Sequence, residues 1–335
     1  MTEDGLIWLR EDEIVDLIDL NDAIDALESG LKEEGSGAAK NIPKALGTWG
    51  DGSSMHALGS VFTEAGYCGW KTWANTKKGA EALFILFDSD NGGLKAVMEA
   101  VALGMMRTSA ISGLATRWLA QDDATEMALV GTGHQALTQV AAVGAVRPLE
   151  RLKVFSPTAE NRAKFVTQAR EVFDFEVEEA ASVEDCVAGA PIVTLVTRAS
   201  EPFLTADMLA RGAHLNAVGA ILPGRQEFTQ DVFGRADLVV GDYLPNLQRV
   251  SQEFIEYFED GLGDWSEVKL LSEIIAQGEK RPAGADITLF KAMGMGISDL
   301  SVAKVAYERA RERGVGTPVA KPGRAKPHWR ALERV

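Results

Sequence analysis

Apolar residues follow two different periods in the first 120 residues of the chain. Four aliphatic residues recur at helical spacing in a segment that begins near Asn21 and ends near Gly35: Leu20, Ile24, Leu27 and Leu31. Further along, the apolar runs 84–87 and 94–98 flank a polar turn at 88–93, which is typical of two strands joined by a turn. We therefore expect an α+β part with an antiparallel sheet.

From about Asp122 the pattern changes to short apolar runs that alternate with helical segments. The predicted strands are 127–130, 152–155, 192–197, 214–218, 237–240 and 286–290. The predicted helices are 134–145, 158–170, 205–210 and 298–313, and Thr205 is the expected N-cap of the third. Repeated strand–helix units of this length indicate a parallel sheet covered on both faces, so we expect the α/β class.

Composition narrows the classes of function. The chain carries 34 basic and 49 acidic side chains, a formal net charge of −15, which disfavours nucleic acid or an anionic membrane as a partner. The two cysteines, Cys68 and Cys186, are far apart without metal-type spacing and fit a reducing cytoplasm. The first residues carry Glu3 and Asp4 and no apolar run of signal-peptide length, and no run approaches the roughly 18 apolar residues of a membrane span. We expect a cytoplasmic protein.

Residues 131–136 read Gly-Thr-Gly-His-Gln-Ala, directly after a predicted strand and at the start of a predicted helix. In this context Gly-x-Gly-x-x-Ala is typical of a dinucleotide site: Gly131 permits the tight turn, and Gly133 lets the backbone approach a pyrophosphate. The helix N-terminus then offers free amides to the phosphates. The alternative is a plain glycine-rich turn between a strand and a helix.

The end of the second strand normally contacts the cofactor ribose: an acidic residue there binds the 2′-hydroxyl of NAD, and an arginine binds the 2′-phosphate of NADP. The sequence here, Ser156-Pro157-Thr158, has neither. Arg162 and Lys164 either reach a 2′-phosphate or form a solvated helix face, and we favour the solvated face. NAD(H) and NADP(H) therefore both remain open, with a slight preference for NAD(H).

Four strings now occur in an order that resembles the ornithine cyclodeaminase/mu-crystallin family. They are Met-Arg-Thr-Ser-Ala at 106–110, the glycine-rich loop, Asn-Ala-Val-Gly-Ala at 216–220, and Ile-Thr-Leu-Phe-Lys at 287–291 followed by Gly294 and Asp299-Leu300. The resemblance covers about residues 10–315. It implies a Rossmann-type nucleotide-binding domain over 121–299, an α+β substrate-binding and dimerisation domain formed by 1–120 and 300–335, and a homodimer.

The resemblance also implies roles for single residues. Arg107 would hold the substrate carboxylate, a task that suits a forked guanidinium; a structural ion pair is the alternative. Thr108 would contact the cofactor phosphates, and Arg225 stands where relatives often have a cofactor-contacting lysine. The other residues expected at the cofactor are Gly131, Thr132, Gly133, His134, Gln135, Ser156, Thr158, Arg162, Thr197, Val218, Gly219, Ala220 and Ala292.

Two lysines and one histidine are the candidates for the chemistry. Lys44 matches a position that is lysine in the alanine dehydrogenase branch and arginine in cyclodeaminases, and Lys71 matches the Gly-x-Lys of the family. Either would bind the carboxylate, or supply the proton that an imine nitrogen or carbonyl oxygen needs, if a cationic and partly dry site lowers its pKa. His56 lies in a segment that faces the substrate in relatives, so it is either a proton donor or a structural histidine.

One departure from the family pattern narrows the reaction. Cyclodeaminases carry an Asp, their key acid/base, two residues after the first Gly of Gly-Gly-Asp-Cys-Pro-Gly-Lys-Thr-Glu, and this chain has Ile221 there. An isoleucine cannot move a proton, so ornithine cyclodeamination is disfavoured. The remaining chemistry is an NAD(P)H-dependent reduction of a small 2-imino acid, reversible as an amino-acid dehydrogenase. The alternatives are a cyclic ketimine reductase and a mu-crystallin-like NAD(P)H- and ligand-binding protein.

Charge near the expected site bears on the substrate. More positive charge than one carboxylate requires comes from Lys44, Lys71 and Arg107, with Lys77 or Lys78. This surplus suggests a dicarboxylic substrate such as iminosuccinate, and an alanine dehydrogenase-like reaction is the other possibility. Pairing of these cations with Glu99 or Glu64 is the alternative.

A metal site is not expected. Asp88, Asp90, Gly93 and Glu99 have the spacing of a calcium-binding loop, but Gly92 stands at a ligand position and the flanking segments are predicted strands.

Overall fold

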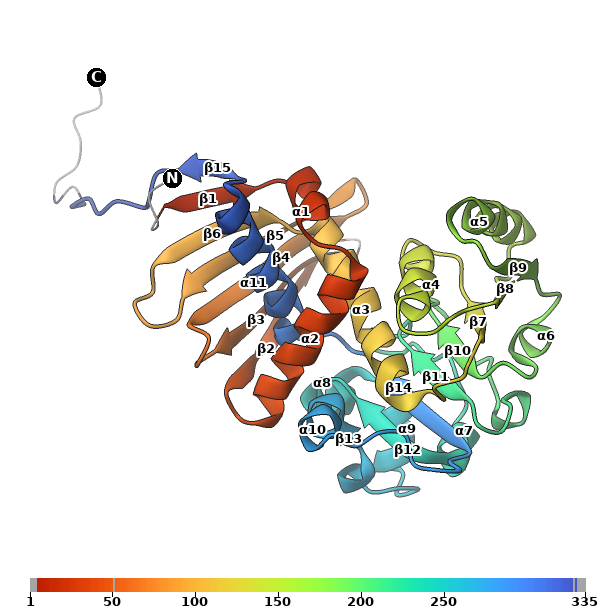
Figure 1. Cartoon of the computed structure of the whole chain (residues 1–335). Coiled ribbons are helices and arrows are strands. Elements are labelled where there is room, and N and C mark those ends of the chain that lie inside the picture. The colour runs from red at the N-terminus through yellow and green to blue at the C-terminus, as the bar shows by residue number, and fades with distance from the viewer. Residues whose placement is uncertain (1–4, 51, 328, 330–335) are drawn as a thin grey trace.

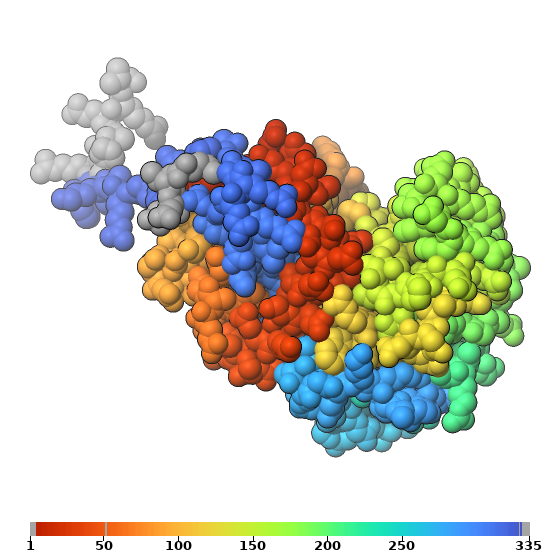
Figure 2. Space-filling view, viewed as in Figure 1, coloured from red at the N-terminus to blue at the C-terminus, as the bar shows by residue number. Residues whose placement is uncertain are grey.

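The computed structural model describes residues 5–50, 52–327 and 329, so the chain ends named in the predicted boundaries at 1 and 335, with Glu3 and Asp4, lie outside the described residues. Within the described residues the strands form two sheets, one of seven strands and one of eight. Figure 1 shows the two sheets side by side, each with its own helices. In the space-filling view the two parts touch along the red α2 and yellow α3 segments, and a hollow separates the red part from the green one (Figure 2).

The first sheet has the strand order β15-β1-β6-β5-β4-β3-β2. Its strands are β1 (Leu6–Leu9), β2 (Ala39–Trp49), β3 (Ser53–Phe62), β4 (Tyr67–Thr76), β5 (Gly79–Asp88), β6 (Leu94–Glu99) and β15 (Thr317–Val319). The turn predicted at 88–93 joins β5 to β6 as expected. The sheet is antiparallel except for one pair, because β1 lies parallel to β6. The strand β15, which the sequence analysis did not predict, lies antiparallel beside β1.

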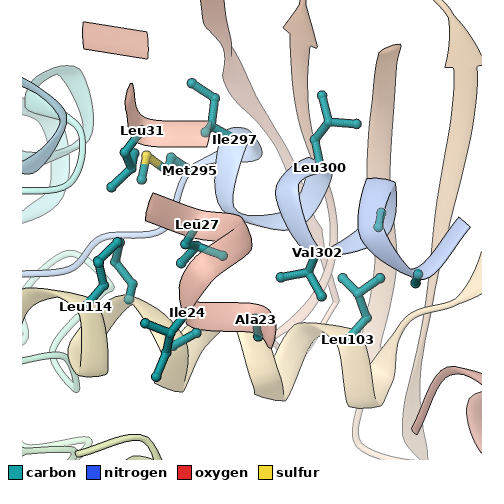
Figure 3. Packing of buried hydrophobic residues seen from close by; sticks show 14 of the residues in the cluster. Ala23, Ile24, Leu27, Leu31, Leu103, Leu114, Met295, Ile297, Leu300 and Val302 are labelled. Carbon is teal, nitrogen blue, oxygen red and sulfur yellow. The ribbon is translucent and has the colours of Figure 1, made fainter. Parts of the chain in front are cut away.

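Helices cover one face of this sheet (Figure 1). They are α1 (Glu11–Leu17), α2 (Leu20–Gly35), α3 (Val101–Leu119) and α11 (Gly296–Arg313). Three of the four aliphatic residues predicted at helical spacing, Ile24, Leu27 and Leu31, lie on the buried face of α2, whereas Leu20 is partly exposed. The helix α2 lies between α3 and α11 (Figure 3). Leu27 belongs to the same buried cluster as Leu103 and Val302, and the full burial of each such leucine stabilises the fold by about 1.5–3 kcal/mol.

Carboxylates fix where two of these helices begin. The Asp19 side chain accepts a hydrogen bond from the backbone N–H of Asp22 at 2.9 Å, which caps α2. The carboxylate of Glu11 accepts from the backbone N–H groups of Val101 and Ala102 at 2.6 and 2.7 Å, which places a negative charge at the positive end of α3. This bond orients α3, the helix that carries Arg107.

The second sheet is parallel throughout, with the order β13-β12-β14-β11-β10-β7-β8-β9. Its strands are β7 (Glu126–Val130), β8 (Arg151–Phe155), β9 (Glu176–Glu179), β10 (Ile192–Leu195), β11 (His214–Ala217), β12 (Ala236–Gly241), β13 (Lys269–Leu270) and β14 (Ile287–Lys291). Its helices are α4 (Ala136–Gly144), α5 (Ala159–Val172), α6 (Val183–Val187), α7 (Asp231–Arg235), α8 (Leu244–Val250), α9 (Gln252–Glu259) and α10 (Leu271–Gln277), with two 3₁₀ turns at Ala206–Met208 and Trp265–Glu267. The strand order reverses at β7, where open α/β sheets bind their ligands.

The helix predicted at 205–210 is wrong in type and length. Only a 3₁₀ turn forms there, and the Thr205 hydroxyl donates to the Asp207 carboxylate instead of capping a backbone amide. A short local bond of this kind competes with the helix, which explains the failure of the expected N-cap. Among the described residues no helix is both long and apolar enough to cross a membrane.

Candidate active site

A buried carboxylate holds two of the predicted site residues together. Lys71 on β4 and Arg107 on α3 both point at Asp299 on α11: its Oδ1 lies 3.2 Å from Lys71 Nζ and 3.1 Å from Arg107 Nε. Asp299 is fully buried and Lys71 is 6% exposed. A Cβ at Gly104, one turn before Arg107, would lie 2.4 Å from Lys71 Nζ, so the glycine leaves the room for the ammonium group.

The indole ring of Trp73 contacts the other two predicted residues, Lys44 and His56, as well as Lys71. Trp73 follows Lys71 by two positions on β4, so both side chains lie on the same face of the sheet. The ring of His56 stacks on Trp73 with centroids 4.5 Å apart. The ammonium groups of Lys44 and Lys71 lie 5.6 and 5.3 Å from the ring centroid, which is cation–π distance. Lys44, His56, Lys71 and Arg107, far apart in the sequence, therefore meet in one site.

A β-bulge brings Lys44 to this face. The pairing of β2 with β3 shifts register between Ile42 and Ala45, at the position of Pro43. Proline has no backbone N–H to offer a neighbouring strand, so a bulge at this point is expected.

Burial and mutual repulsion make the ammonium groups weaker bases. Burial lowers the pKa of Lys71, Asp299 opposes this change, and the nearby positive charge of Arg107 adds to it. The pKa of Lys44 is also lowered, by burial and then by Arg107, Arg249 and Lys71. A lysine whose pKa is lowered gives up its proton more readily than an ordinary lysine, as a general acid must.

His56 is neutral at pH 7. Burial, and to a smaller extent the charge of Lys44, lowers the pKa of His56 to about 4. Its Nε2 lies 2.8 Å from the hydroxyl of Ser54, and its Nδ1 is buried without a hydrogen-bond partner among the described residues. A neutral imidazole with one free nitrogen suits a substrate contact better than proton donation.

Sequence analysis missed three residues of this site. Asp299 occurs in a string that carried the family resemblance, but no role was assigned to it. Trp73 carries the signal of strand period, two residues after Lys71. Arg249 on α8 lies close enough to Lys44 to repel its charge. Arg249 donates to Asn246 at 3.4 Å, and Asn246 donates to the carbonyl of Gly294, beside Arg107. No local sequence signal pointed to Arg249.

Two expectations about charges near Lys71 and Arg107 are wrong: Glu99 and Glu64 do not pair with these cations, and Lys77 and Lys78 do not lie beside them. Glu99 accepts instead from Trp8 Nε1 and the backbone N–H of Glu11, at 3.3 and 2.9 Å, and Glu64 is exposed. Asp299 takes their place because α11 returns to the first sheet. Lys77 and Lys78 lie exposed at the turn after β4, roughly 20 Å along the chain direction from Lys71, so they lie away from the cluster.

The glycine-rich loop has the geometry that its residues predict. Gly131 has φ of +114°, and a Cβ there would lie 2.6 Å from the carbonyl oxygen of Val196, so only glycine fits. Gly133 is exposed, and a Cβ there would meet nothing within 4 Å. Thr132, His134 and Gln135 complete the loop before α4 begins at Ala136. The open space at Gly133 and the free amides of α4 suit an anion.

Thr108 lies next to this loop. The side chain of Gln139 on α4 donates to the Thr108 carbonyl at 3.2 Å, which ties α3 to the start of α4. The hydroxyl of Thr108 donates to the carbonyl of Gly104 in its own helix at 2.7 Å. The helix that carries Arg107 thus also borders the glycine-rich loop.

The expectation that Arg162 belongs to a solvated helix face is wrong. Its guanidinium lies 5.6 Å from the Phe155 ring, donates to the Ser156 carbonyl at 2.6 Å and pairs with Glu179 at 3.0 Å. The side chain is 16% exposed, because its apolar stem folds back over the end of β8. Lys164 and Thr158 are exposed.

The ends of β10, β11 and β14 gather the remaining predicted cofactor residues. Thr197 and Gly219 both bond to the buried carboxylate of Glu227, and Val218 and Ala220 flank Gly219. Ala292 donates from its backbone to the carbonyl of Ala217, the last residue of β11. Arg225 lies in the following loop, bonded to the carbonyl of Arg198. Ile221, in the position of the cyclodeaminase Asp, is 41% exposed there.

The calcium-like loop is an ordinary turn. Asp88 accepts from the backbone N–H groups of Asp90 and Asn91 and pairs with Lys95 at 2.9 Å. Within the described residues no group of three or more potential metal ligands comes together.

A family model matches residues 7–314 of the chain: the ornithine cyclodeaminase/mu-crystallin family. The chain belongs to this family. A Δ1-pyrroline-2-carboxylate reductase of Bacillus cereus is 33% identical over 242 residues, 72% of this chain and 74% of that protein.

Solved structures of the family share the whole fold. The Thermococcus litoralis Δ1-pyrroline-2-carboxylate reductase in complex with NADH and L-proline has a TM-score of 0.87 at 28% identity, and covers 93% of this chain and 100% of that one. An archaeal alanine dehydrogenase dimer with bound NAD has a TM-score of 0.86 at 26% identity, and covers 94% and 99%.

These comparisons confirm three predictions: the family, the α/β fold with a nucleotide-binding part and a second part, and an oxidoreductase that acts on amino or imino acids.

Proposed function

We propose that this protein is an NAD(H)-dependent reductase of a small 2-imino acid, reversible as an amino-acid dehydrogenase. The observation that carries the proposal is the Lys71–Asp299–Arg107 cluster: a buried ammonium of lowered pKa held beside a guanidinium. The glycine-rich loop and Thr108, on the same helix as Arg107, fit the cofactor phosphates. The bound cofactor would supply the hydride.

Arg107 binds the substrate carboxylate in this proposal. The ion pair with Asp299 uses Nε, so the two terminal nitrogens remain for a two-pronged contact. Lys71 or Lys44 then provides the proton: the substrate Cα accepts a hydride, the C=N double bond becomes a single bond, and the nitrogen takes the proton. His56 and Trp73 form a wall beside the reacting atoms.

The end of β8 supports NAD(H) over NADP(H). Arg162 is the basic side chain anchored there, and it is already paired with Glu179. A 2′-phosphate would have to displace or face that carboxylate, and like charges repel. Titration with NADH and NADPH tests the preference, and equal or tighter binding of NADPH would contradict it.

The bare face of the first sheet supports a homodimer. Four partly exposed residues make an unbroken apolar row across neighbouring strands: Trp8, Val97, Ile85 and Trp70. A row of this kind on an antiparallel sheet is suited to packing against its own copy. We propose that the first sheet with α2, α3 and α11 binds substrate and dimerises, and that residues 121–299 bind the nucleotide. Light scattering of Ile85→Glu should show a monomer.

Positive charge beyond Arg107 and Lys71 favours a substrate with an acidic side chain. No described carboxylate lies within ion-pair distance of Lys44 or Arg249, which lie close enough for their charges to repel. A second substrate carboxylate would relieve their repulsion, as in iminosuccinate. Replacing Arg249 by Met should then raise KM for oxaloacetate with ammonium about 10-fold and leave pyruvate unaffected.

A direct assay tests the function. NADH absorbance is followed after adding ammonium or methylamine with pyruvate, glyoxylate or oxaloacetate, and in parallel with a cyclic 2-imino acid. Consumption that needs both the amine and the keto acid supports the proposal. Binding of NADH without consumption of any of these substrates would favour the alternative of a mu-crystallin-like binding protein.

A further inference from the structure

A fully buried carboxylate ties two strand ends of the second sheet together. Glu227 Oε1 accepts from the backbone N–H and the hydroxyl of Thr197, at 2.7 and 2.8 Å. Glu227 Oε2 accepts from the backbone N–H groups of Gly219 and Ala220, at 2.9 and 3.1 Å. Thr197 follows β10 and Gly219 follows β11, so one side chain bridges the ends of neighbouring strands.

The close approach requires the residue types that are present. A Cβ at Gly219 would lie 2.2 Å from the Thr197 nitrogen and 2.3 Å from Glu227 Oε1, so no larger residue fits there. All four contacts to the carboxylate come from donors, which lower the pKa of Glu227 against the larger raising effect of complete burial. A glutamine would turn an NH₂ group toward two of these donors.

Two further charges hold Glu227 in place. The backbone N–H of Glu227 donates to Glu253 Oε1 at 3.1 Å, and the same oxygen lies 3.2 Å from Lys291 Nζ. Ser251 donates to the other oxygen of Glu253 at 3.0 Å. Glu227, Glu253 and Lys291 are all enclosed, and Lys291 ends β14, the next strand of the sheet. We call these three residues the buried charge cluster.

The buried charge cluster lies apart from the substrate residues. Its side-chain bonds to other residues go to Thr197, Gly219, Ala220 and Ser251, and among the described residues no hydrogen bond or ion pair joins it to Lys71, Arg107 or Asp299. The cost of burying two carboxylates and one ammonium is large, and replacing them by apolar residues would commonly preserve stability. Fold stability alone therefore does not account for the cluster.

We propose that Glu227 is a positioning residue for the nicotinamide half of the cofactor site, with Glu253 and Lys291 fixing its place. This inference rests on the proposed function, in which the segments around Thr197 and 218–220 border the nicotinamide. By occupying three amides of these segments, the carboxylate fixes the backbone against which the ring would lie. Among the described residues the glycine-rich loop at 131–135 makes no hydrogen bond to the cluster, so binding of the adenosine half should not depend on the cluster.

The test compares two ligands that differ by the nicotinamide. Dissociation constants of NADH and of ADP-ribose are measured for the wild type, for Glu227→Gln and for the control Asp286→Asn. Asp286 pairs with Arg235 beside the start of β14, whereas Lys291 ends that strand. Glu227→Gln should weaken NADH about 10-fold or more and change ADP-ribose less than about twofold. Asp286→Asn should change neither.

Each other outcome counts against the inference. Equal weakening of both ligands would show a general role in folding, and unchanged NADH binding would remove the positioning role. If circular dichroism shows that Glu227→Gln does not fold, Glu253→Gln, which keeps an acceptor oxygen, is judged by the same ratio. A wild-type protein that binds neither NADH nor NAD⁺ would instead refute the proposed function.

Discussion

Lys71 Nζ and Asp299 Oδ1 lie 3.2 Å apart in a site that excludes nearly all water from both groups. Because the same oxygen also binds Arg107, the carboxylate fixes the distance between the proposed proton donor, Lys71, and the proposed carboxylate-binding residue, Arg107. Neither cation can shift without disturbing the other. Three elements supply these residues, β4, α3 and α11, so the geometry depends on the packing of the whole first part.

Replacing the lysines separates proton transfer from binding. Lys71→Met or Lys44→Met should lower kcat by about 100-fold or more for whichever residue is the general acid. Methionine keeps the apolar stem and removes the ammonium. A variant that changes only KM has lost a binding group. Full kcat in both variants would exclude both lysines, and His56 would be the next residue to replace.

Removing the shared carboxylate should move the pH profile. Asp299 raises the pKa of Lys71 against the lowering effect of burial, so Asp299→Asn should lower that pKa further. The reductive direction needs the protonated ammonium, and kcat falls as pH rises through its pKa. We therefore expect this limb of the profile to move to lower pH. An unshifted limb would show that a group other than Lys71 titrates.

Arginine and lysine are not equivalent at position 107. Arg107→Lys keeps the charge but loses the second prong and the Nε contact to Asp299, so kcat/KM should fall about 10- to 1,000-fold. Affinity for NADH should change less, because the proposed phosphate site is the glycine-rich loop at 131–136 and not Arg107. Unchanged kcat/KM would assign Arg107 a purely structural ion pair.

Gly133 can be changed without disturbing the fold. A Cβ there meets nothing within 4 Å, so Gly133→Val should fold normally but place methyl groups where the pyrophosphate would lie. We expect loss of NADH binding in a fluorescence titration. Gly234→Val is the matched control. A Cβ at position 234 also meets nothing within 4 Å, and the residue lies on α7, a helix of the second part of the chain. Normal titration of Gly133→Val would remove the loop from the cofactor site.

Local sequence signals predicted the elements better than the contacts. The glycine-rich loop and the parallel sheet could be predicted from the sequence, because the signals for them, Gly131 and the strand before it, lie close together in the chain. Asp299 and Arg249 were not, because each reaches Lys44, Lys71 or Arg107 only after distant elements pack together. The prediction that Arg162 lies on a solvated helix face was wrong for a related reason. The Phe155 ring and Glu179, which contact its guanidinium, come from two neighbouring strands that meet the helix only in the folded chain.

The protein should not convert ornithine to proline. Cyclodeamination needs an oxidation at Cα, attack by the δ-amine, loss of ammonia and return of the same hydride, so a free acid or base must act at the middle steps. The loop at 219–226 has no carboxylate: Ile221 and Leu222 are exposed and apolar. The nearest acid in sequence, Glu227, is buried with both oxygens bonded to Thr197, Gly219 and Ala220. Asp299 is engaged by Lys71 and Arg107, and a δ-ammonium would add another positive charge beside them. Incubation with ornithine and catalytic NAD⁺, followed by assays for proline and ammonia, should therefore give neither above background. Proline at an ordinary enzymatic rate would mean that one of these two carboxylates is released from its partners during turnover.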